Sequence, residues 1–155
     1  MSNNNMLLEA RNITKVFSSG GIIGSKKRVT VALDNASLAI RSDPPAIITI
    51  AGESGSGKTT LSRLLLGLIS PTKGDIYYKG KLLSEMSHDE WMGFRRSVQA
   101  IFQDPFEVYN PFYAVDHALL TPLACFEPKM PKAQRRELME KTLAGVGLRP
   151  EETLG

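Results

Sequence analysis

Apolar residues alternate with polar ones along the first part of the chain, and a spacing of two residues is typical of β-strands. Residues 6–17 begin with this alternation, and residues 29–40 show it on both sides of Asp34-Asn35. Residues 18–25 are rich in glycine and serine, which is typical of a loop. We therefore expect two or three antiparallel strands in this region, with a break at Asp34-Asn35.

Two later runs are almost wholly apolar, as expected of strands that are buried on both faces. The first run covers residues 46–51 and the second covers residues 98–102. Between them, residues 75–78 and 81–83 are predicted to be short strands joined by a turn at Lys79-Gly80. The sequence thus predicts antiparallel strands followed by a parallel strand, a loop and a helix.

Helices are predicted where apolar spacing and start or stop signals agree. They cover residues 60–67, residues 87–96 with a capping box at Ser87 and Glu90, residues 115–120 between Asn110-Pro111 and Thr121-Pro122, and residues 131–145 with Leu138, Met139 and Leu143 on the apolar side.

The segment between the run 46–51 and the first helix carries a specific chemistry. Its sequence, Gly52-Glu53-Ser54-Gly55-Ser56-Gly57-Lys58-Thr59, fits the phosphate-binding pattern G-x-x-x-x-G-K-[ST]. In such a turn the backbone N–H groups and the helix N-terminus face a phosphate. The lysine reaches the β- and γ-phosphates, and the threonine hydroxyl ligates Mg²⁺. The alternative is a chance match in an ordinary strand-to-helix turn.

Composition limits the remaining possibilities. The chain has 155 residues, is 42% hydrophobic and carries a net charge of +3, which suits one globular domain. Its basic residues are dispersed, so nucleic-acid binding is not expected. The lone Cys125 forms no internal disulfide and fits a reducing compartment. The polar N-terminus lacks a signal-peptide pattern, and the longest apolar runs fall far below the roughly 20 residues of a membrane helix. We expect no direct membrane insertion.

Four stretches, taken together, resemble the ATP-binding subunits of ABC transporters. They are residues 12–17 ending in an aromatic, the phosphate loop 52–60, the link 66–74, and Ile101-Phe102-Gln103-Asp104-Pro105, which is similar to the family's Q-loop. The loops at 20–28, 102–111 and 146–150 resemble those of the branch that imports dipeptides and oligopeptides.

The resemblance implies an α/β fold in which three regions follow one another. Residues 46–103 would form a P-loop NTPase (RecA-like) core. Residues 1–45 would form an antiparallel β subdomain before it, and residues 104–155 would begin a helical subdomain.

The resemblance also implies ATP and Mg²⁺ as cofactors. Phe17 would stack on the adenine, and Gln103 would approach Mg²⁺ and position the attacking water. The phosphates would be held by Gly52, Ser54, Gly55, Ser56, Gly57, Lys58, Thr59 and Thr60, with Thr59 also a metal ligand. The alternative for Phe17 is a core residue that closes a strand, and the alternative for Gln103 is a polar residue that ends one.

The implied partners are a second ATP-binding subunit, paired head to tail, and membrane-spanning permease subunits. The permease would dock near Phe106–Phe112, where Phe106, Val108, Tyr109 and Phe112 form an apolar patch, and would hold the chain at the cytoplasmic face of the membrane. Packing of this patch within the helical subdomain is the alternative.

Several family motifs are missing from these 155 residues, namely the signature, the Walker B Asp, the catalytic Glu and the switch His. His88 and His117 lie upstream of the switch position, and we expect both to be ordinary helical residues. The sequence therefore predicts a truncated ATP-binding subunit of an importer, which binds nucleotide but does not hydrolyse it alone.

The alternatives are a nucleotide-binding or regulatory module without hydrolysis of its own, and another P-loop class such as a GTPase or small-molecule kinase. A GTPase lacks support because the guanine-specifying pattern Asn-Lys-x-Asp is absent.

Overall fold

The computed structural model of the chain describes residues 5–19, 28–102 and 112–154. These residues form two compact units, Met1–Ala100 and Ile101–Gly155. No helix in the described ranges is both long enough and apolar enough to cross a membrane.

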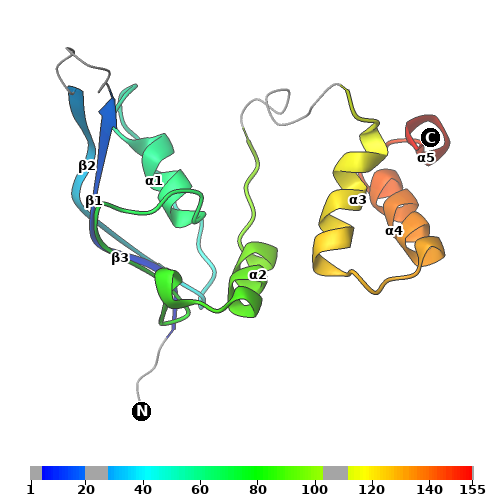
Figure 1. Cartoon of the computed structure of the whole chain (residues 1–155), viewed down its shortest axis with the longest axis horizontal. Helices are drawn as coiled ribbons and strands as arrows, with labels where there is room; N and C mark the ends of the chain where they lie inside the picture. The colour runs from blue at the N-terminus through cyan, green and yellow to red at the C-terminus, as the bar shows by residue number, and fades with distance from the viewer. Residues whose placement is uncertain (1–4, 20–27, 103–111, 155) are drawn as a thin grey trace. The chain divides into compact units, whose positions relative to one another are not determined.

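The first unit is built on an antiparallel sheet with the strand order β2-β1-β3-β4. Its strands are β1 (Met6–Ser19), β2 (Arg28–Arg41), β3 (Lys73–Tyr78) and β4 (Lys81–Leu82). Figure 1 shows β1 and β2 running side by side, with α1 (Lys58–Leu65) next to them. The predicted early strands and the hairpin at Lys79-Gly80 are confirmed. Leu83, the last residue of the predicted hairpin, instead begins a short 3-10 helix, Leu83–Glu85.

The predicted break at Asp34-Asn35 is wrong, because β2 continues through it. Asn35 does adopt a left-handed backbone with φ of 48°, and the pairing with β1 is irregular there. Side chains supply hydrogen bonds at this irregularity. Asn12 Nδ2 donates to Asn35 Oδ1 at 3.0 Å, and the Asn35 amide donates to Thr14 Oγ1 at 3.1 Å. The distortion is therefore accommodated within one strand.

The core of this unit joins the sheet to two helices. Its buried side chains are Leu8, Ala10, Ile13, Leu64, Ile76, Tyr78 and Phe94. Leu64 comes from α1, and Phe94 comes from α2 (His88–Ser97). The Phe94 ring meets Tyr78 edge to face at 5.1 Å between centroids, a favoured aromatic geometry. This core fixes α1, and therefore the turn that precedes it, against the sheet.

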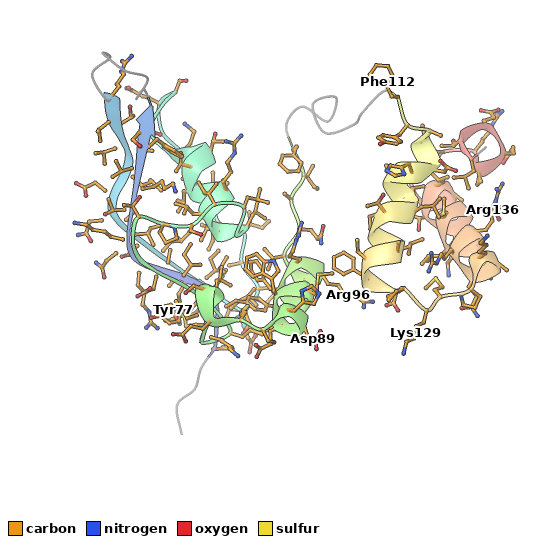
Figure 2. All side chains as sticks on the ribbon, viewed as in Figure 1. Tyr77, Asp89, Arg96, Phe112, Lys129 and Arg136 are labelled. Atoms are coloured by element: carbon orange, nitrogen blue, oxygen red, sulfur yellow. The ribbon has the colours of Figure 1, made fainter. Side chains whose placement is uncertain are left out.

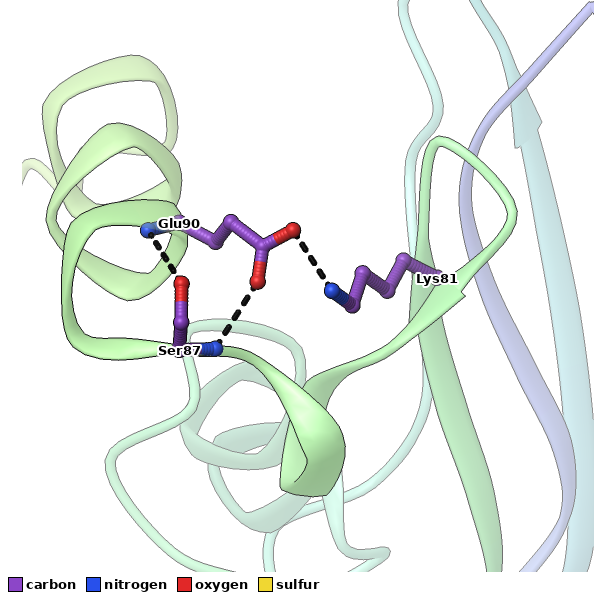
Figure 3. A network of polar contacts seen from close by, with 3 residues as sticks. All are labelled: Lys81, Ser87 and Glu90. Atoms are coloured by element: carbon purple, nitrogen blue, oxygen red, sulfur yellow. Dashed lines mark hydrogen bonds and ion pairs between the residues drawn. The ribbon is translucent and has the colours of Figure 1, made fainter.

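The predicted capping box of α2 is confirmed. Glu90 N donates to Ser87 Oγ at 3.4 Å, and Ser87 N donates to Glu90 Oε2 at 2.8 Å. Glu90 also accepts a hydrogen bond from Lys81 Nζ at 2.5 Å, which ties the helix start to β4 (Figure 3).

The two predicted apolar core strands are wrong. Neither 46–51 nor 98–102 is a strand, and both carry exposed apolar side chains. Ile47 is 99% exposed and Ile101 is 103% exposed. A parallel strand is held by hydrogen bonds to its neighbours. Within the described ranges neither run pairs with another strand, so the apolar pattern alone does not form a sheet.

The second unit contains α3 (Val115–Phe126), α4 (Lys132–Gly145) and α5 (Pro150–Thr153). Its buried residues are Met139, Leu143 and Leu154, against which Leu119, Leu120 and Leu123 pack. The predicted end of α3 at residue 120 is wrong, because the helix continues through Pro122. Proline removes one backbone hydrogen bond, but Leu123, beyond it, still packs on α4. Leu138, predicted on the apolar side of α4, is 41% exposed.

Candidate functional site

The phosphate loop forms a tight turn that ends at the first residue of α1. Gly55 and Gly57 have φ angles of 82° and 91°, a left-handed conformation that favours glycine. The Ser56 amide donates to the Glu53 carbonyl at 3.2 Å, which closes the turn. Gly57 is the N-cap of α1, and its carbonyl accepts the hydrogen bond from Leu61 N at 2.8 Å.

The two glycines differ in their surroundings. A Cβ on Gly57 would lie 2.5 Å from the Ala32 carbonyl oxygen and 2.9 Å from Leu33 Cδ2, so this part of the turn sits directly on β2. A Cβ on Gly55 would meet nothing within 4 Å. The turn is therefore anchored at Gly57 and open at Gly55.

Lys58 folds back over the turn. Its Nζ donates to the Gly52 carbonyl at 2.7 Å, to the Glu53 carbonyl at 2.6 Å and to Ser56 Oγ at 3.4 Å. An ammonium has three donors, so these contacts use them all. They hold the positive charge over the loop, where a phosphate oxygen would compete with the two carbonyls for it.

The N-terminus of α1 has the chemistry of an anion site. The first backbone N–H groups of a helix have no partner within the helix. No side chain caps Gly57, and the first turn contains no acidic residue. Thr59 is exposed and Thr60 is half-buried, so the Thr59 hydroxyl is accessible to solvent. Taken with Gly55 and Lys58, these residues fit a bound phosphate chain, with Thr59 as the candidate oxygen ligand of a Mg²⁺ ion.

Phe17 lies on β1 opposite Thr30 and is 43% exposed. Residues two apart on a strand share a face, so Phe17 lies on the same face as Lys15. Lys15 pairs with Leu33, the residue that also meets the Cβ position of Gly57. The hairpin therefore presents the aromatic ring on the face against which the phosphate loop packs.

The sequence also singled out residues that are distant from the phosphate loop along the chain. Gln103 and residues 106–111 lie outside the described residues. Phe112, the remaining member of the predicted docking patch, stands just before the first turn of α3 and is 93% exposed (Figure 2). The two histidines are exposed helical residues, His88 at the start of α2 and His117 in α3, where it stacks on Tyr113 at 4.3 Å.

One residue near the site was missed from the sequence. Lys15 Nζ lies 5.2 Å from the centroid of the Phe17 ring and donates to the Ser70 carbonyl at 2.6 Å. The spacing in the sequence could have indicated Lys15, because a lysine two residues before an aromatic residue lies on the same face of the strand. Its contact with Ser70, 55 residues away, was not predictable from local pattern.

Comparison with known proteins agrees with this arrangement. The sequence profile of the family described as "ABC transporter" matches residues 33–154. The oligopeptide transport ATP-binding protein OppF of Escherichia coli is 39% identical over 101 residues, covering 65% of this chain and 30% of OppF. The nickel import ATP-binding protein NikE of Rhodospirillum rubrum is 36% identical over 146 residues, covering 94% of this chain and 51% of NikE. The chain thus spans about half or less of the length of these relatives.

A solved structure gives the same result at the level of the fold. A dimeric ATP-binding cassette in a post-hydrolysis state, bound to ADP and Pi, superposes with a TM-score of 0.66 at 26% identity. The match covers 90% of this chain and 57% of the cassette chain. The fold class predicted from the sequence is confirmed, as a partial α/β cassette with an antiparallel β subdomain.

Proposed function

Because the chain belongs to the ABC transporter family, we propose that it binds ATP with Mg²⁺ as the nucleotide-binding part of an importer subunit. The observation that carries this proposal is the phosphate loop, with Gly57 anchored on β2 and the Lys58 ammonium held over the turn. A phosphate chain would take the Lys58 ammonium from the Gly52 and Glu53 carbonyls, which remain exposed to water.

The rest of the nucleotide would extend from the loop along the adjoining hairpin face. Phe17 would stack on the adenine, a contact that contributes on the order of 1–3 kcal/mol for a base on an aromatic ring. The amides from Gly55 to Thr60 would donate to phosphate oxygens. A Mg²⁺ ion in such sites is held by few protein oxygens together with the phosphates, so Thr59 and Gln103 are the proposed protein ligands.

The transported solute is proposed to be a dipeptide or oligopeptide, and the name of OppF states oligopeptide transport for that protein. Nickel is the second candidate, because NikE matches 94% of this chain at 36% identity. In either case the chain would pair with a second ATP-binding subunit and attach to permease subunits at the cytoplasmic face of the membrane. The region near Phe106–Phe112 would face the permease, which the high exposure of Phe112 supports.

The proposal predicts that Lys58→Ala weakens ATP binding about ten- to a hundredfold. This range follows from the roughly 1.5–3 kcal/mol of a hydrogen bond to a charged group. Isothermal titration calorimetry of Mg-ATP into the chain measures the Kd. Because Lys58 contacts exposed carbonyls and not the core, circular dichroism should show an unchanged fold for this variant.

Lys73→Ala is the matched control. Lys73 begins β3 and is exposed, so its removal subtracts the same charge without touching the loop. The Kd of this variant should stay within about twofold of the unmodified chain, because exposed charges at a distance are screened by salt. Equal weakening by both substitutions would mean that the site depends only on net charge, and would contradict the proposal.

A further inference from the structure

We propose that Lys15 is a positioning residue that orients the Phe17 ring for the nucleobase and fixes its distance from the phosphate loop. This inference rests on the proposed function, since it assigns a second residue to the base side of the same site. Lys15 would act through Phe17 and not by touching the phosphates.

The first observation is the contact between the two side chains. Lys15 Nζ lies over the Phe17 ring, 5.2 Å from its centroid, within the range of a cation–π interaction. The ring is 43% exposed, so its packing against other groups holds it only in part. An ammonium over one face restricts the rotation of the ring and leaves the opposite face for a flat ligand.

The second observation is what holds the ammonium. Its Nζ donates to the Ser70 carbonyl at 2.6 Å, a short charge-assisted hydrogen bond. Ser70 lies in the segment between α1 and β3, and α1 begins at the phosphate loop. Lys15 therefore connects the aromatic ring to the segment that leaves α1, the helix whose N-terminus adjoins the phosphate loop.

The backbone around Phe17 is hydrogen-bonded to the same segment. The Val16 amide donates to Thr72 Oγ1 at 3.0 Å, and the Thr72 amide donates to the Thr14 carbonyl at 2.8 Å. These bonds fix the strand without Lys15, so removing the lysine side chain should free the ring and leave the strand in place. Because the ring and the strand are held by different bonds, a positioning role of Lys15 can be distinguished from a structural one.

The test compares ATP with inorganic tripolyphosphate, which has the phosphates but neither base nor ribose. Lys15→Met should weaken the binding of Mg-ATP about two- to fivefold, the range expected from a cation–π contact at an exposed site. It should leave the Kd of tripolyphosphate unchanged. In a Phe17→Ala background the same substitution should have no further effect on ATP, because the ring on which it acts is gone.

The chain offers a matched control for the loss of this interaction. Lys79 Nζ lies over the Tyr78 ring at the same distance, 5.2 Å, on β3 and its turn. Lys79→Met should change the Kd of neither ligand. Lys15→Arg, which keeps a cation over the ring and a donor for Ser70, should restore ATP binding to near that of the unmodified chain.

The outcomes separate this inference from the proposed function. If the unmodified chain binds neither ATP nor tripolyphosphate, the proposed function fails and Lys15 has nothing to position. If the unmodified chain binds ATP and Lys15→Met weakens ATP and tripolyphosphate equally, Lys15 acts on charge or stability and the inference is overturned. An unchanged or tightened Kd for ATP in Lys15→Met would overturn it as well.

Discussion

At the scale of single residues, the site depends on two glycines that share a backbone conformation but not an environment. Both Gly55 and Gly57 have a left-handed backbone, which costs a residue with a side chain roughly 1–2 kcal/mol. Only Gly57 has a close neighbour, because its Cβ would stand 2.5 Å from the Ala32 carbonyl oxygen on β2. That neighbour is backbone within a paired strand and does not rotate away.

Gly57→Ala should therefore destabilise the chain more than Gly55→Ala. We expect Gly55→Ala to lose roughly 1–2 kcal/mol from conformation alone, and Gly57→Ala to lose about 1–3 kcal/mol more because α1 must shift off β2. Urea denaturation followed by circular dichroism measures both free energies of unfolding. Equal losses for the two variants would show that the contact with Ala32 does not constrain the turn.

The phosphate-loop residues were predictable because their chemistry is local in sequence. The spacing of Gly57 and Lys58 fixes which groups the turn brings together, whatever surrounds it. The contacts of Gly57 with β2 and of Lys15 with Ser70 join residues that are tens of positions apart, and no local pattern encodes them. The sequence therefore predicted the residues of the loop but not the surfaces that hold it.

At the scale of elements, the start of α2 carries a titratable network. The Glu90 carboxylate accepts hydrogen bonds from Lys81 Nζ and from the Ser87 amide, and these bonds lower the pKa of Glu90 to about 2. Lys81 contributes most, then the Ser87 backbone and side chain. Figure 3 shows the carboxylate between these two donors.

This network predicts a loss of stability in acid. The pKa of Glu90 in the folded chain lies below the ordinary 4.5, so folding favours the carboxylate form. The contribution is complete above about pH 4.5 and is lost as the pH falls from there toward 2. Urea denaturation at pH 5, 4 and 3 should show a smaller decline for Glu90→Gln than for the unmodified chain.

The size of this effect is limited by solvent. The Lys81 and Glu90 side chains are 46% and 42% exposed, so salt should weaken their interaction. Repeating the series in 0.5 M sodium chloride (on the order of a 4 Å screening length) should reduce the difference between the two chains. Identical pH profiles at low salt would contradict the assigned network.

The elements that were predicted correctly have a local pattern in their own residues. Those that were predicted wrongly depend on pairing or packing with segments that are distant in the sequence. Ser87 and Glu90 are themselves the two residues of the α2 capping box, and the alternation of apolar and polar residues predicts β1. The runs 46–51 and 98–102 have the composition of buried strands, but a strand needs a partner to pair with. Conversely, α3 passes through Pro122 because packing on α4 outweighs the lost hydrogen bond.

At the scale of the whole molecule, the two units have separate cores. The larger core joins the sheet to α1 and α2, and the smaller one joins α3, α4 and Leu154. The proposed nucleotide-site residues that the structure describes all belong to the first unit, Met1–Ala100. A ligand bound at the phosphate loop should therefore stabilise the first unit directly.

That expectation gives the most direct test of the central claim, that the phosphate loop of this chain binds ATP. A ligand that binds the folded state alone adds about 2.7 kcal/mol of stability at roughly 100 times its Kd. For a unit of about 100 residues this corresponds to a rise in Tm on the order of 10 °C. Thermal unfolding followed by circular dichroism should show this rise in millimolar Mg-ATP for the unmodified chain, and about half of it or less for Lys58→Ala, because a ten- to hundredfold weaker Kd leaves less ligand bound. An unchanged Tm in the unmodified chain, or an equal rise in both chains, would contradict the account.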